Sequence, residues 1–289
     1  MKGKMISYNL HQHTLFSDGK DKPEKYVEKA LEQGFTALGF SEHSPLPFDT
    51  SFSLKEEQID EYILTINKLK EKYHNRLAIY RALEMDYIPG FSEDFGLLQK
   101  KCQTDYLIGS VHLVRPEDTD ELWFTDGPDY RVYDKGIKDF FGGNIRKAVK
   151  AFYHQSNQMI ETQQFDIIGH FDKITMHNRN RFFTDEEKWY RDLVNETVEL
   201  IKQKNLIVEI NTRGIYKKRS DTFFPDGYAL RQVKMKNIPI LISSDAHQAA
   251  EISMLFDDAR QYLTDLGFYD VMYFENRHWK PIPLEEVSF

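Results

Sequence analysis

Seven short apolar segments, rich in β-branched residues, recur along the chain and alternate with longer amphipathic segments. Each apolar segment predicts a buried strand, because parallel strands covered on both faces are apolar almost throughout. The predicted strands span residues 6–13, 35–43, 77–86, 104–112, 165–172, 205–213 and 238–247. This alternation predicts an α/β fold with parallel strands and right-handed crossovers, arranged as an open doubly wound sheet or as a closed barrel.

The segments between the predicted strands have the pattern of helices. Residues 22–34 are one example, since Pro23 suits a first helical turn and Gly34 suits a C-terminal cap. Further helices are expected over residues 55–74, 144–163, 184–205 and 228–237. No repeat and no Pro/Gly/Ser-rich linker divides the chain, so we expect a single barrel domain over residues 5–289.

Residues 113–143 form a long insertion after the fourth predicted strand. Because it leaves the end of a strand, we expect this insertion to act as a lid over the site described below. Its acidic residues are candidates for contacts with the ammonium of an amino alcohol, although solvent exposure is the commoner role for any one of them.

Titratable side chains close six of the seven predicted strands, and this pattern separates the two sheet arrangements. The residues are His11, His13, His43, Glu84, His112, His170, Asp245 and His247. In a barrel, the C-terminal ends of all strands converge on one mouth. An open sheet concentrates its ligand site at one switch point and draws on fewer strands. The distribution of these side chains therefore favours the barrel.

The same side chains predict metal binding. Residues two apart on a strand point to the same face, so His11 and His13 can aim at one point, as can Asp245 and His247. Imidazoles mixed with carboxylates favour zinc, manganese or iron over magnesium or calcium. With Asp18, the set is too large for one ion, since a catalytic zinc takes about three protein ligands. We expect two or three divalent transition metals.

Each residue also has a simpler explanation when it is taken alone. A solitary histidine such as His43 or His112 is usually a hydrogen-bonded core or surface residue. Asp18, in a Ser-Asp-Gly sequence, fits a turn, and Glu84 fits a structural ion pair. The paired positions are harder to explain in this way, because burying an unpaired polar group costs on the order of a few kcal/mol.

Composition narrows the class of protein. A formal net charge of −8 argues against the broad basic surface that nucleic-acid binding needs. No apolar run reaches the roughly 18 residues of a membrane span, and the N-terminal residues lack the apolar centre of a secretory signal. The single cysteine, Cys102, suits a reducing compartment. We expect a cytoplasmic protein without nucleic-acid or membrane partners, while its oligomeric state stays open.

Six motifs occur in an order that resembles the polymerase and histidinol phosphatase (PHP) superfamily, and they are most similar to its monofunctional histidinol-phosphatase branch. The motifs are HQHTLFSDG, SEH, ALEMDYIPG, GSVH, GHFD and SSDAH. The resemblance spans almost the whole chain and implies a distorted, TIM-like (β/α)7 barrel with a trinuclear metal site at the C-terminal ends of its parallel strands. In many relatives the position matching Asp18 is a histidine, so the third metal site can differ here in metal preference or occupancy.

Carried over residue by residue, the resemblance implies three ligand sets, of which the first two share Glu84. The sets are His11, His13, Glu84 and Asp245 for the first metal, Glu84, His112 and His170 for the second, and Asp18, His43 and His247 for the third.

The resemblance also implies a reaction, the hydrolysis of L-histidinol phosphate to L-histidinol and phosphate in histidine biosynthesis. Its substrate is then a small phosphorylated amino alcohol. Metal ions bridged by a carboxylate lower the pKa of a shared water toward about 7, which supplies a nucleophile at neutral pH. Glu84 and Asp245 are the expected catalytic carboxylates. The chain lacks a P-loop, a Cys-centred phosphatase loop and a serine nucleophile elbow, in agreement with this chemistry.

Arginines that follow the fifth and sixth predicted strands are candidates for binding the phosphate. Arg179 and Arg213 are the expected ligands, because guanidinium groups form paired hydrogen bonds with phosphate oxygens. Arg181 fits a solvated basic loop equally well, and Lys173 and His177 are weaker candidates.

Two other functions stay open at this point. One is a nuclease or nucleotide phosphatase on the same metal scaffold, against which the acidic net charge argues. The other is a metal-storing or regulatory protein without turnover.

Overall fold

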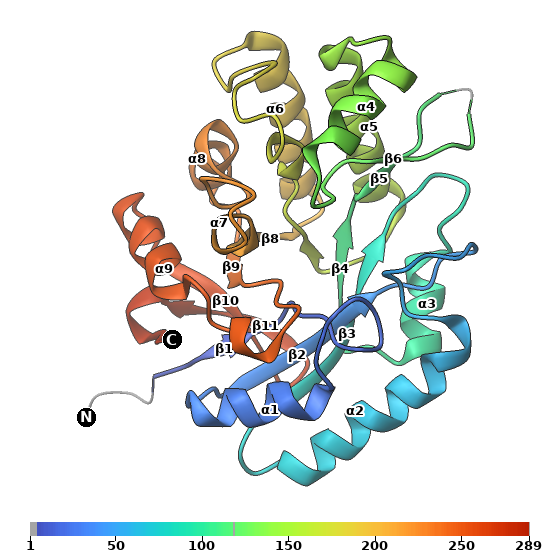
Figure 1. The fold of residues 1–289 in the computed structure, drawn as a ribbon. Helices are drawn as coiled ribbons and strands as arrows, with labels where there is room; N and C mark the ends of the chain where they lie inside the picture. The colour runs from blue at the N-terminus through green and yellow to red at the C-terminus, as the bar shows by residue number, and fades with distance from the viewer. Residues whose placement is uncertain (1–4, 118, 289) are drawn as a thin grey trace.

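A seven-stranded parallel sheet forms the centre of the computed structural model, which describes residues 5–117 and 119–288 (Figure 1). The strand order is β1-β2-β3-β4-β7-β8-β9. The strands are β1 (Tyr8–Asn9), β2 (Ala37–His43), β3 (Ala78–Asp86), β4 (Tyr106–Ser110), β7 (Ile167–Ile168), β8 (Ile207–Asn211) and β9 (Ile240–Ser243). All seven predicted strands are present, although β1 and β7 pair over fewer residues than expected.

The sheet curls until its two edges nearly meet. A parallel bridge between Gln12 and Ala246 joins the segment after β1 to the segment after β9, and the His13 amide donates to the Ala246 carbonyl at 2.8 Å. Deeper in the barrel, the Asn9 side chain donates to the Ser244 hydroxyl at 2.8 Å. The predicted distorted, TIM-like (β/α)7 barrel is therefore confirmed.

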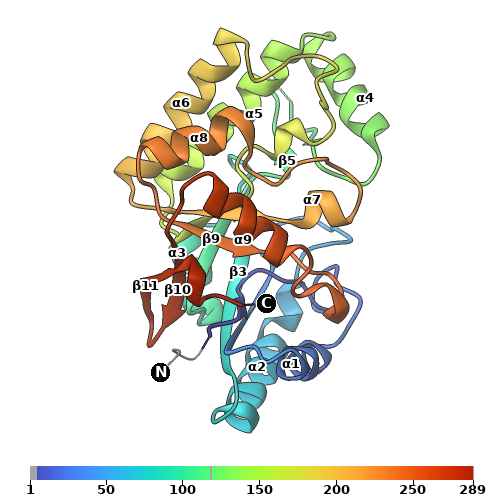
Figure 2. The same cartoon turned by 90° about the vertical axis from the view of Figure 1, so that its left-hand side faces the viewer.

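Helices surround the barrel, with α1 and α2 on one side and α5, α6 and α8 on the opposite side (Figures 1 and 2). The helices that cross over between sheet strands, together with the last helix, are α1 (Pro23–Glu32), α2 (Ile59–Tyr73), α3 (Phe95–Cys102), α5 (Ile145–Thr162), α6 (Lys188–Gln203), α8 (Gly227–Met235) and α9 (Phe256–Asp265). Shorter elements are α7 (Arg213–Tyr216) and the 3-10 turns η1 (Glu56–Gln58), η2 (Lys173–Thr175), η3 (Ala249–Glu251) and η4 (Leu284–Glu286). Helix α1 begins at Pro23, and Gly34 follows it with a φ of 75°, as predicted.

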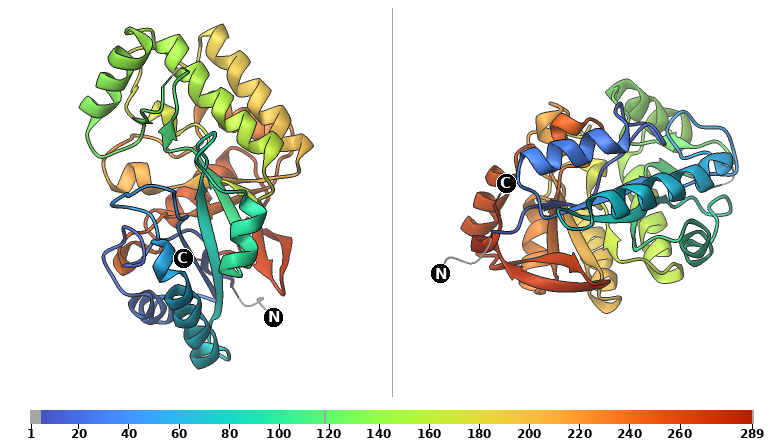
Figure 3. Two further views of the ribbon diagram at one scale, coloured as in Figure 1. Left: turned by 90° about the vertical axis from the view of Figure 1, so that its right-hand side faces the viewer. Right: turned by 90° about the horizontal axis from the view of Figure 1, so that it is seen from below.

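A C-terminal hairpin of β10 (Asp270–Glu275) and β11 (His278–Pro283) packs against the N-terminal ends of the barrel strands. The ring of Tyr106, at the start of β4, lies 5.5 Å from that of Phe274 and 5.6 Å from that of Trp279. Figure 3 shows the hairpin and the insertion helix α4 (Tyr130–Phe141) at opposite corners of the molecule. The hairpin, which the sequence analysis did not anticipate, thus packs on the end of the barrel away from the site.

The insertion over residues 113–143 is folded rather than irregular. It contains a short antiparallel pair, β5 (Leu113–Val114) with β6 (Trp123–Phe124), followed by α4. Trp123 is buried against Tyr133 with ring centroids 5.2 Å apart, which joins the pair to the helix. Within this insertion, residue 118 lies outside the described residues. The role of the insertion as a lid and the single-domain organisation stay predictions.

Gly39, on β2, occupies one of the tightest positions inside the barrel. A Cβ atom there would lie 1.9 Å from the hydroxyl of Tyr106, which donates to the Leu10 carbonyl. We expect Gly39→Ala to lower the free energy of unfolding by about 3 kcal/mol, because it displaces a buried ring and breaks its hydrogen bond. Thermal unfolding should show a fall of several degrees in Tm.

Gly96→Ala is the matched control for this prediction. Gly96 lies in the first turn of α3, and the nearest contact of an added Cβ would be the Asp94 carboxylate oxygen at 3.2 Å. The free energy of unfolding should change by no more than about 1 kcal/mol in this variant. An unchanged Tm for Gly39→Ala would contradict the tight packing described here.

Candidate metal centre

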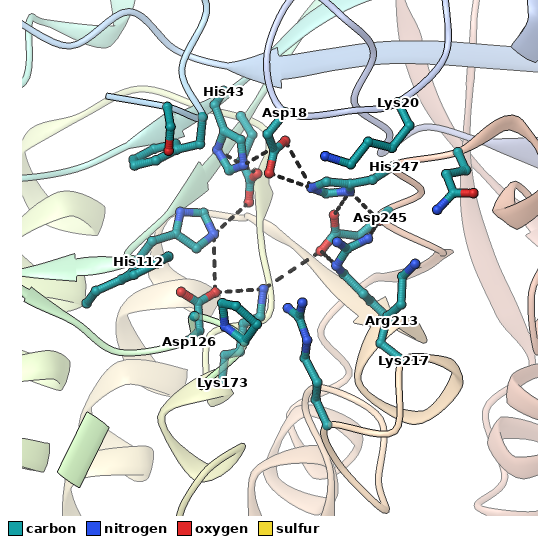
Figure 4. Close-up of a pocket in the computed structure, with 18 residues that line it drawn as sticks. Asp18, Lys20, His43, His112, Asp126, Lys173, Arg213, Lys217, Asp245 and His247 are labelled. Carbon is teal, nitrogen blue, oxygen red and sulfur yellow. Dashed lines mark hydrogen bonds and ion pairs between the residues drawn. The ribbon is translucent and has the colours of Figure 1, made fainter. Parts of the chain in front are cut away.

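A cavity of about 540 Å³ opens at the C-terminal ends of the barrel strands (Figure 4). Most of the predicted ligands lie on its wall, namely Asp18, His43, Glu84, His112, Asp245 and His247. The remaining three, His11, His13 and His170, are buried directly behind them. The structure therefore brings all nine predicted ligands together, from strands separated by more than half of the chain.

Glu84, near the end of β3, lies at the middle of this cluster. Its Oε2 atom is 3.2 Å from His11 Nε2 and 3.3 Å from His13 Nε2. Its Oε1 atom is 3.0 Å from His170 Nε2 and 3.4 Å from His112 Nε2. One carboxylate thus faces two imidazole pairs, one with each oxygen, which is the arrangement of a carboxylate that bridges two ions.

The first ligand group has the spacing of a zinc-sized cation. The Nε2 atoms of His11 and His13 are 3.2 Å apart, and Asp245 Oδ1 is 3.4 Å from His13 Nε2. Around a tetrahedral ion with bonds of about 2.0–2.1 Å, ligand atoms lie about 3.3–3.4 Å apart. The nitrogen atoms of His112 and His170 that face Glu84 are separated by 3.3 Å and meet the same criterion. The residues present therefore fit bound divalent metals.

The third group surrounds Asp18. His247 Nε2 is 3.0 Å from Asp18 Oδ1, and His43 Nε2 is 3.9 Å from the same oxygen. His13 also lies close enough to belong to this group. The turn that carries Asp18 depends on Gly19, because a Cβ atom there would lie 2.1 Å from the His13 carbonyl oxygen. The Ser-Asp-Gly turn thus places a carboxylate at the cavity, so the turn and ligand interpretations are compatible.

Asp86 orients two of the imidazoles, and the sequence analysis missed it. Its Oδ2 atom accepts a hydrogen bond from His43 Nδ1 at 3.0 Å, and its Oδ1 atom accepts one from His112 Nδ1. These bonds leave the Nε2 lone pairs of both rings directed at the cluster, and such bonds commonly fix the ligand ring. Asp86 follows Glu84 by two residues on β3, so the alternation that paired His11 with His13 also predicts its position.

Two further buried carboxylates accept hydrogen bonds from the ligand residues or from the segment beside them. Glu209, on β8, accepts a hydrogen bond from His11 Nδ1 and another from the His170 amide at 3.0 Å. Glu42, on β2, accepts from the Thr14 amide at 2.9 Å and thereby holds the segment that leads to Asp18. Both were missed, although a glutamate within an apolar strand is itself a signal of a buried polar contact.

The cluster strongly perturbs the protonation of its members. Burial alone would lower the pKa of His13, but hydrogen bonds with Asp245 and Glu84 raise it to about 9. Burial lowers the pKa of His247 to about 3, and the charge of His13 contributes in the same direction. Burial alone would raise the pKa of Glu84, but His11 and the other imidazoles hold it well below its usual range. At pH 7, the metal-free protein therefore holds His13 as a cation, His247 as a neutral ring and Glu84 as an anion.

We expect metal binding at pH 7 to release protons, because a ligand imidazole must be neutral. His13 is protonated below about pH 9, so the apparent metal affinity should weaken as pH falls from 9, by about tenfold per pH unit for one proton. Calorimetric titration with zinc in two buffers of different ionisation enthalpy measures this release. A His247→Asn variant should bind fewer ions per chain yet release the same number of protons per chain, because the His247 ring is already neutral before metal binds. Metal binding by the wild type without proton release at pH 7 would contradict the expectation.

Cationic side chains form another part of the cavity wall. Arg213, nearly buried, donates from Nη1 to the Asp245 carbonyl at 2.7 Å, so it lies where the sequence analysis expected it. Lys173, a weaker candidate, places Nζ 2.9 Å from Asp126 Oδ2 and 3.7 Å from Asp245 Oδ2. Lys20, Lys217 and Arg219 also line the cavity. Arg219 carried no signal in the sequence, because loop geometry alone brings it to the mouth, whereas Asp126 is one of the acidic residues of the insertion that were candidates for ammonium contacts.

Arg179 is a correction, because the structure places it away from this wall. It is exposed, and its Nη2 atom donates to the Lys218 carbonyl at 3.1 Å. Arg181 pairs through both terminal nitrogens with Asp134 at 2.8 Å, which ties this loop to α4. His177 contacts the carbonyl of residue 127 rather than the metal cluster. Proximity to a strand end in sequence does not determine which way a loop side chain points.

Comparisons with known proteins found relatives in both sequence and fold. Histidinol-phosphatase of Bacillus subtilis is 27% identical over 262 residues, covering 86% of this chain and 96% of that protein. A provisionally named histidinol phosphatase of Listeria monocytogenes has a solved structure with a TM-score of 0.76 and 23% identity, covering 87% of this chain and 99% of that one.

The histidinol phosphate phosphatase of Lactococcus lactis was solved in complex with Zn, L-histidinol and phosphate. It matches with a TM-score of 0.68 and 23% identity, covering 96% of this chain and 99% of that one. Within the chain, residues 9–213 match the PHP domain, and this region contains seven of the nine predicted ligands. The chain belongs to the PHP domain family.

Proposed function

We propose that this protein is a metal-dependent phosphomonoesterase that hydrolyses L-histidinol phosphate to L-histidinol and phosphate. The main support is the position of Glu84 between two imidazole pairs in a cavity that also exposes Lys173 and Arg213. Cations beside a metal cluster match the charge of a phosphate monoester. The relatives named histidinol-phosphatase, and the histidinol and phosphate bound by one of them, support this choice of substrate.

The ligand geometry supports a proposal of three divalent ions, zinc, manganese or iron, in the three sets inferred from the sequence. Glu84 belongs to the first two sets, and Asp18 with His43 and His247 forms the third. When bound, such ions supply Lewis acidity and a water of lowered pKa. Asp86 and Glu209 would hold the imidazoles in register before a substrate arrives.

Side chains of the chain itself would bind and orient the phosphate. Arg213 is held by the Asp245 carbonyl, and Lys173 is held between Asp126 and Asp245. Both cations are therefore fixed in place, which keeps the cost of ordering them during catalysis low. We propose Lys173, Arg213 and Arg219 as the phosphate ligands in place of Arg179.

Phosphate release from the metal-loaded protein tests this function. We expect hydrolysis of L-histidinol phosphate, with much lower rates on nucleoside bisphosphates and short oligonucleotides. Elemental analysis of the same sample should show two or three divalent ions per chain. Hydrolysis confined to nucleotides or oligonucleotides would favour the nuclease alternative, and ion binding that raises Tm without any hydrolysis would favour metal storage.

A further inference from the structure

One part of the cavity wall supplies neither a metal ligand nor a phosphate ligand in the arrangement described above, although one of its residues positions Lys173. It consists of Asp126, from the insertion, and the rings of Phe52 and Phe124. Figure 4 shows Asp126 beside His112 and Lys173, directed into the space in front of the metal ligands. We call this set the Asp126 subsite.

Asp126 is rigidly positioned by its two neighbours in sequence. Before it, Thr125 donates to the His112 carbonyl from both its amide and its hydroxyl, each at 3.0 Å. After it, the carbonyl of Gly127 is 2.8 Å from His177 Nε2, which completes a hydrogen bond. The backbone on both sides of Asp126 is therefore held at a fixed place relative to the end of β4.

The carboxylate of Asp126 has an unused acceptor. Its Oδ2 atom pairs with Lys173 Nζ at 2.9 Å, while its Oδ1 atom is buried and has no hydrogen-bond partner among the residues that the structure describes. A buried carboxylate oxygen without a donor is costly, so the site is built for a donor that arrives with a ligand. Since the oxygen carries negative charge, a cationic N–H group is the best match.

Two aromatic rings line the same cavity as this carboxylate. Phe52 and Phe124 have centroids 6.3 Å apart and planes inclined by only 11°, and both line the cavity. Phe52 also contacts the ring of His43 edge-on at 5.2 Å. Phe124 precedes Asp126 by two residues, so the apolar surface and the charge belong to one short segment. Half-buried aromatic faces at a cavity suit a flat ring of a ligand.

We propose that the Asp126 subsite selects phosphate esters whose alcohol carries an ammonium group next to a flat ring. Asp126 Oδ1 accepts a hydrogen bond from the ammonium, and Phe52 and Phe124 contact the ring while the phosphate lies at the metal cluster. This inference rests on the proposed phosphatase function and extends it to the recognition of the non-reacting end of the substrate. Asp126 is thus a specificity-determining residue.

Three substrates separate these contributions in the metal-loaded enzyme. L-Histidinol phosphate carries the amine and the ring, O-phosphoethanolamine carries only the amine, and ethylene glycol monophosphate carries neither. The amine preference is the kcat/KM for O-phosphoethanolamine divided by that for ethylene glycol monophosphate. We expect Asp126→Asn to lower this ratio about 10–100-fold, because a hydrogen bond between two charged groups becomes one to a neutral amide. Any effect of the substitution on Lys173 and on phosphate binding is common to both substrates, so it cancels in the ratio.

The matched control is Asp129→Asn in the same insertion, where the carboxylate caps α4 and pairs with Arg131 away from the cavity. It should leave the amine preference within about twofold. Phe124→Leu, or Phe52→Leu if the first variant does not fold, should lower the preference for L-histidinol phosphate over O-phosphoethanolamine about 3–10-fold and leave the amine preference unchanged.

The outcomes separate this inference from the proposed function. If the wild type does not hydrolyse L-histidinol phosphate, the proposed function fails. If it does, but Asp126→Asn retains the amine preference while losing rate equally on all three substrates, the subsite is overturned. Loss of bound metal in Asp126→Asn would likewise overturn it and assign the carboxylate to the metal cluster near His112.

Discussion

Glu84→Gln is expected to lower kcat/KM for phosphate release by on the order of 10³-fold or more and to reduce the number of bound divalent ions. Glutamine has the shape of glutamate but lacks its charge, and its amide group presents N–H donors to one of the two imidazole pairs. The carboxylate oxygens lie 3.0–3.4 Å from four imidazole nitrogens, so no rotamer of glutamine can satisfy both pairs. Steady-state kinetics and elemental analysis on the same sample measure both effects.

Asp166→Asn provides a matched control at the other end of the barrel. Its carboxylate accepts hydrogen bonds from the Leu107 amide at 2.9 Å and from the Trp279 side chain at 3.1 Å. The variant removes a partly buried charge without approaching the metal cluster, so it should lower Tm but keep the ion content. If Glu84→Gln kept its full ion content and most of its activity, a bridging role for Glu84 would be wrong.

The barrel could be predicted from the sequence because buried parallel strands have a pattern of their own. The positions of the ligands followed from the same pattern, since the end of each apolar run marks the same edge of the sheet. The strand lengths were less predictable. Residues 165–172 were expected to form one strand, but pairing is limited to β7, and the chain bends until His170 has a φ of 25°.

The sequence signal for the turn of the C-terminal hairpin was weak. Its turn consists of Asn276 and Arg277, with φ angles of 52° and 65°. Two-residue hairpin turns of this kind usually contain glycine, which adopts positive φ at little cost. Without glycine at either position, the sequence Asn-Arg does not stand out as a turn, and the hairpin that packs beneath Tyr106 went unrecognised.

Whether a site residue can be predicted from the sequence likewise depends on whether it lies on a strand or in a loop. Asp86 and Glu209 lie on strands and follow the two-residue alternation, so they could have been identified beside the predicted ligands. Arg179 and Arg219 lie in loops. The cavity is lined by Arg219 and not by Arg179, which follows from the backbone geometry of their loops rather than from any residue pattern.

Removal of the divalent ions is expected to abolish phosphate release and to lower Tm. The ligands run from His11 to His247, so the unfolded chain has no comparable site, and binding to the folded state adds directly to stability. At a free metal concentration a thousandfold above Kd, this contribution is about 4 kcal/mol. Dialysis against a chelator should therefore lower Tm by several degrees, and added zinc or manganese should restore both stability and activity.

The Glu84→Gln variant makes this experiment specific to the cluster. Because its sites are weakened, chelation should change its Tm much less than that of the wild type, whereas Asp166→Asn should respond as the wild type does. Phosphate release by a wild-type sample with no detectable ion would contradict the metal requirement. An equal loss of Tm in Glu84→Gln and wild type would instead locate the stabilising ion away from Glu84, in the third ligand set or elsewhere in the protein, since only an ion bound through Glu84 is weakened when that carboxylate is replaced.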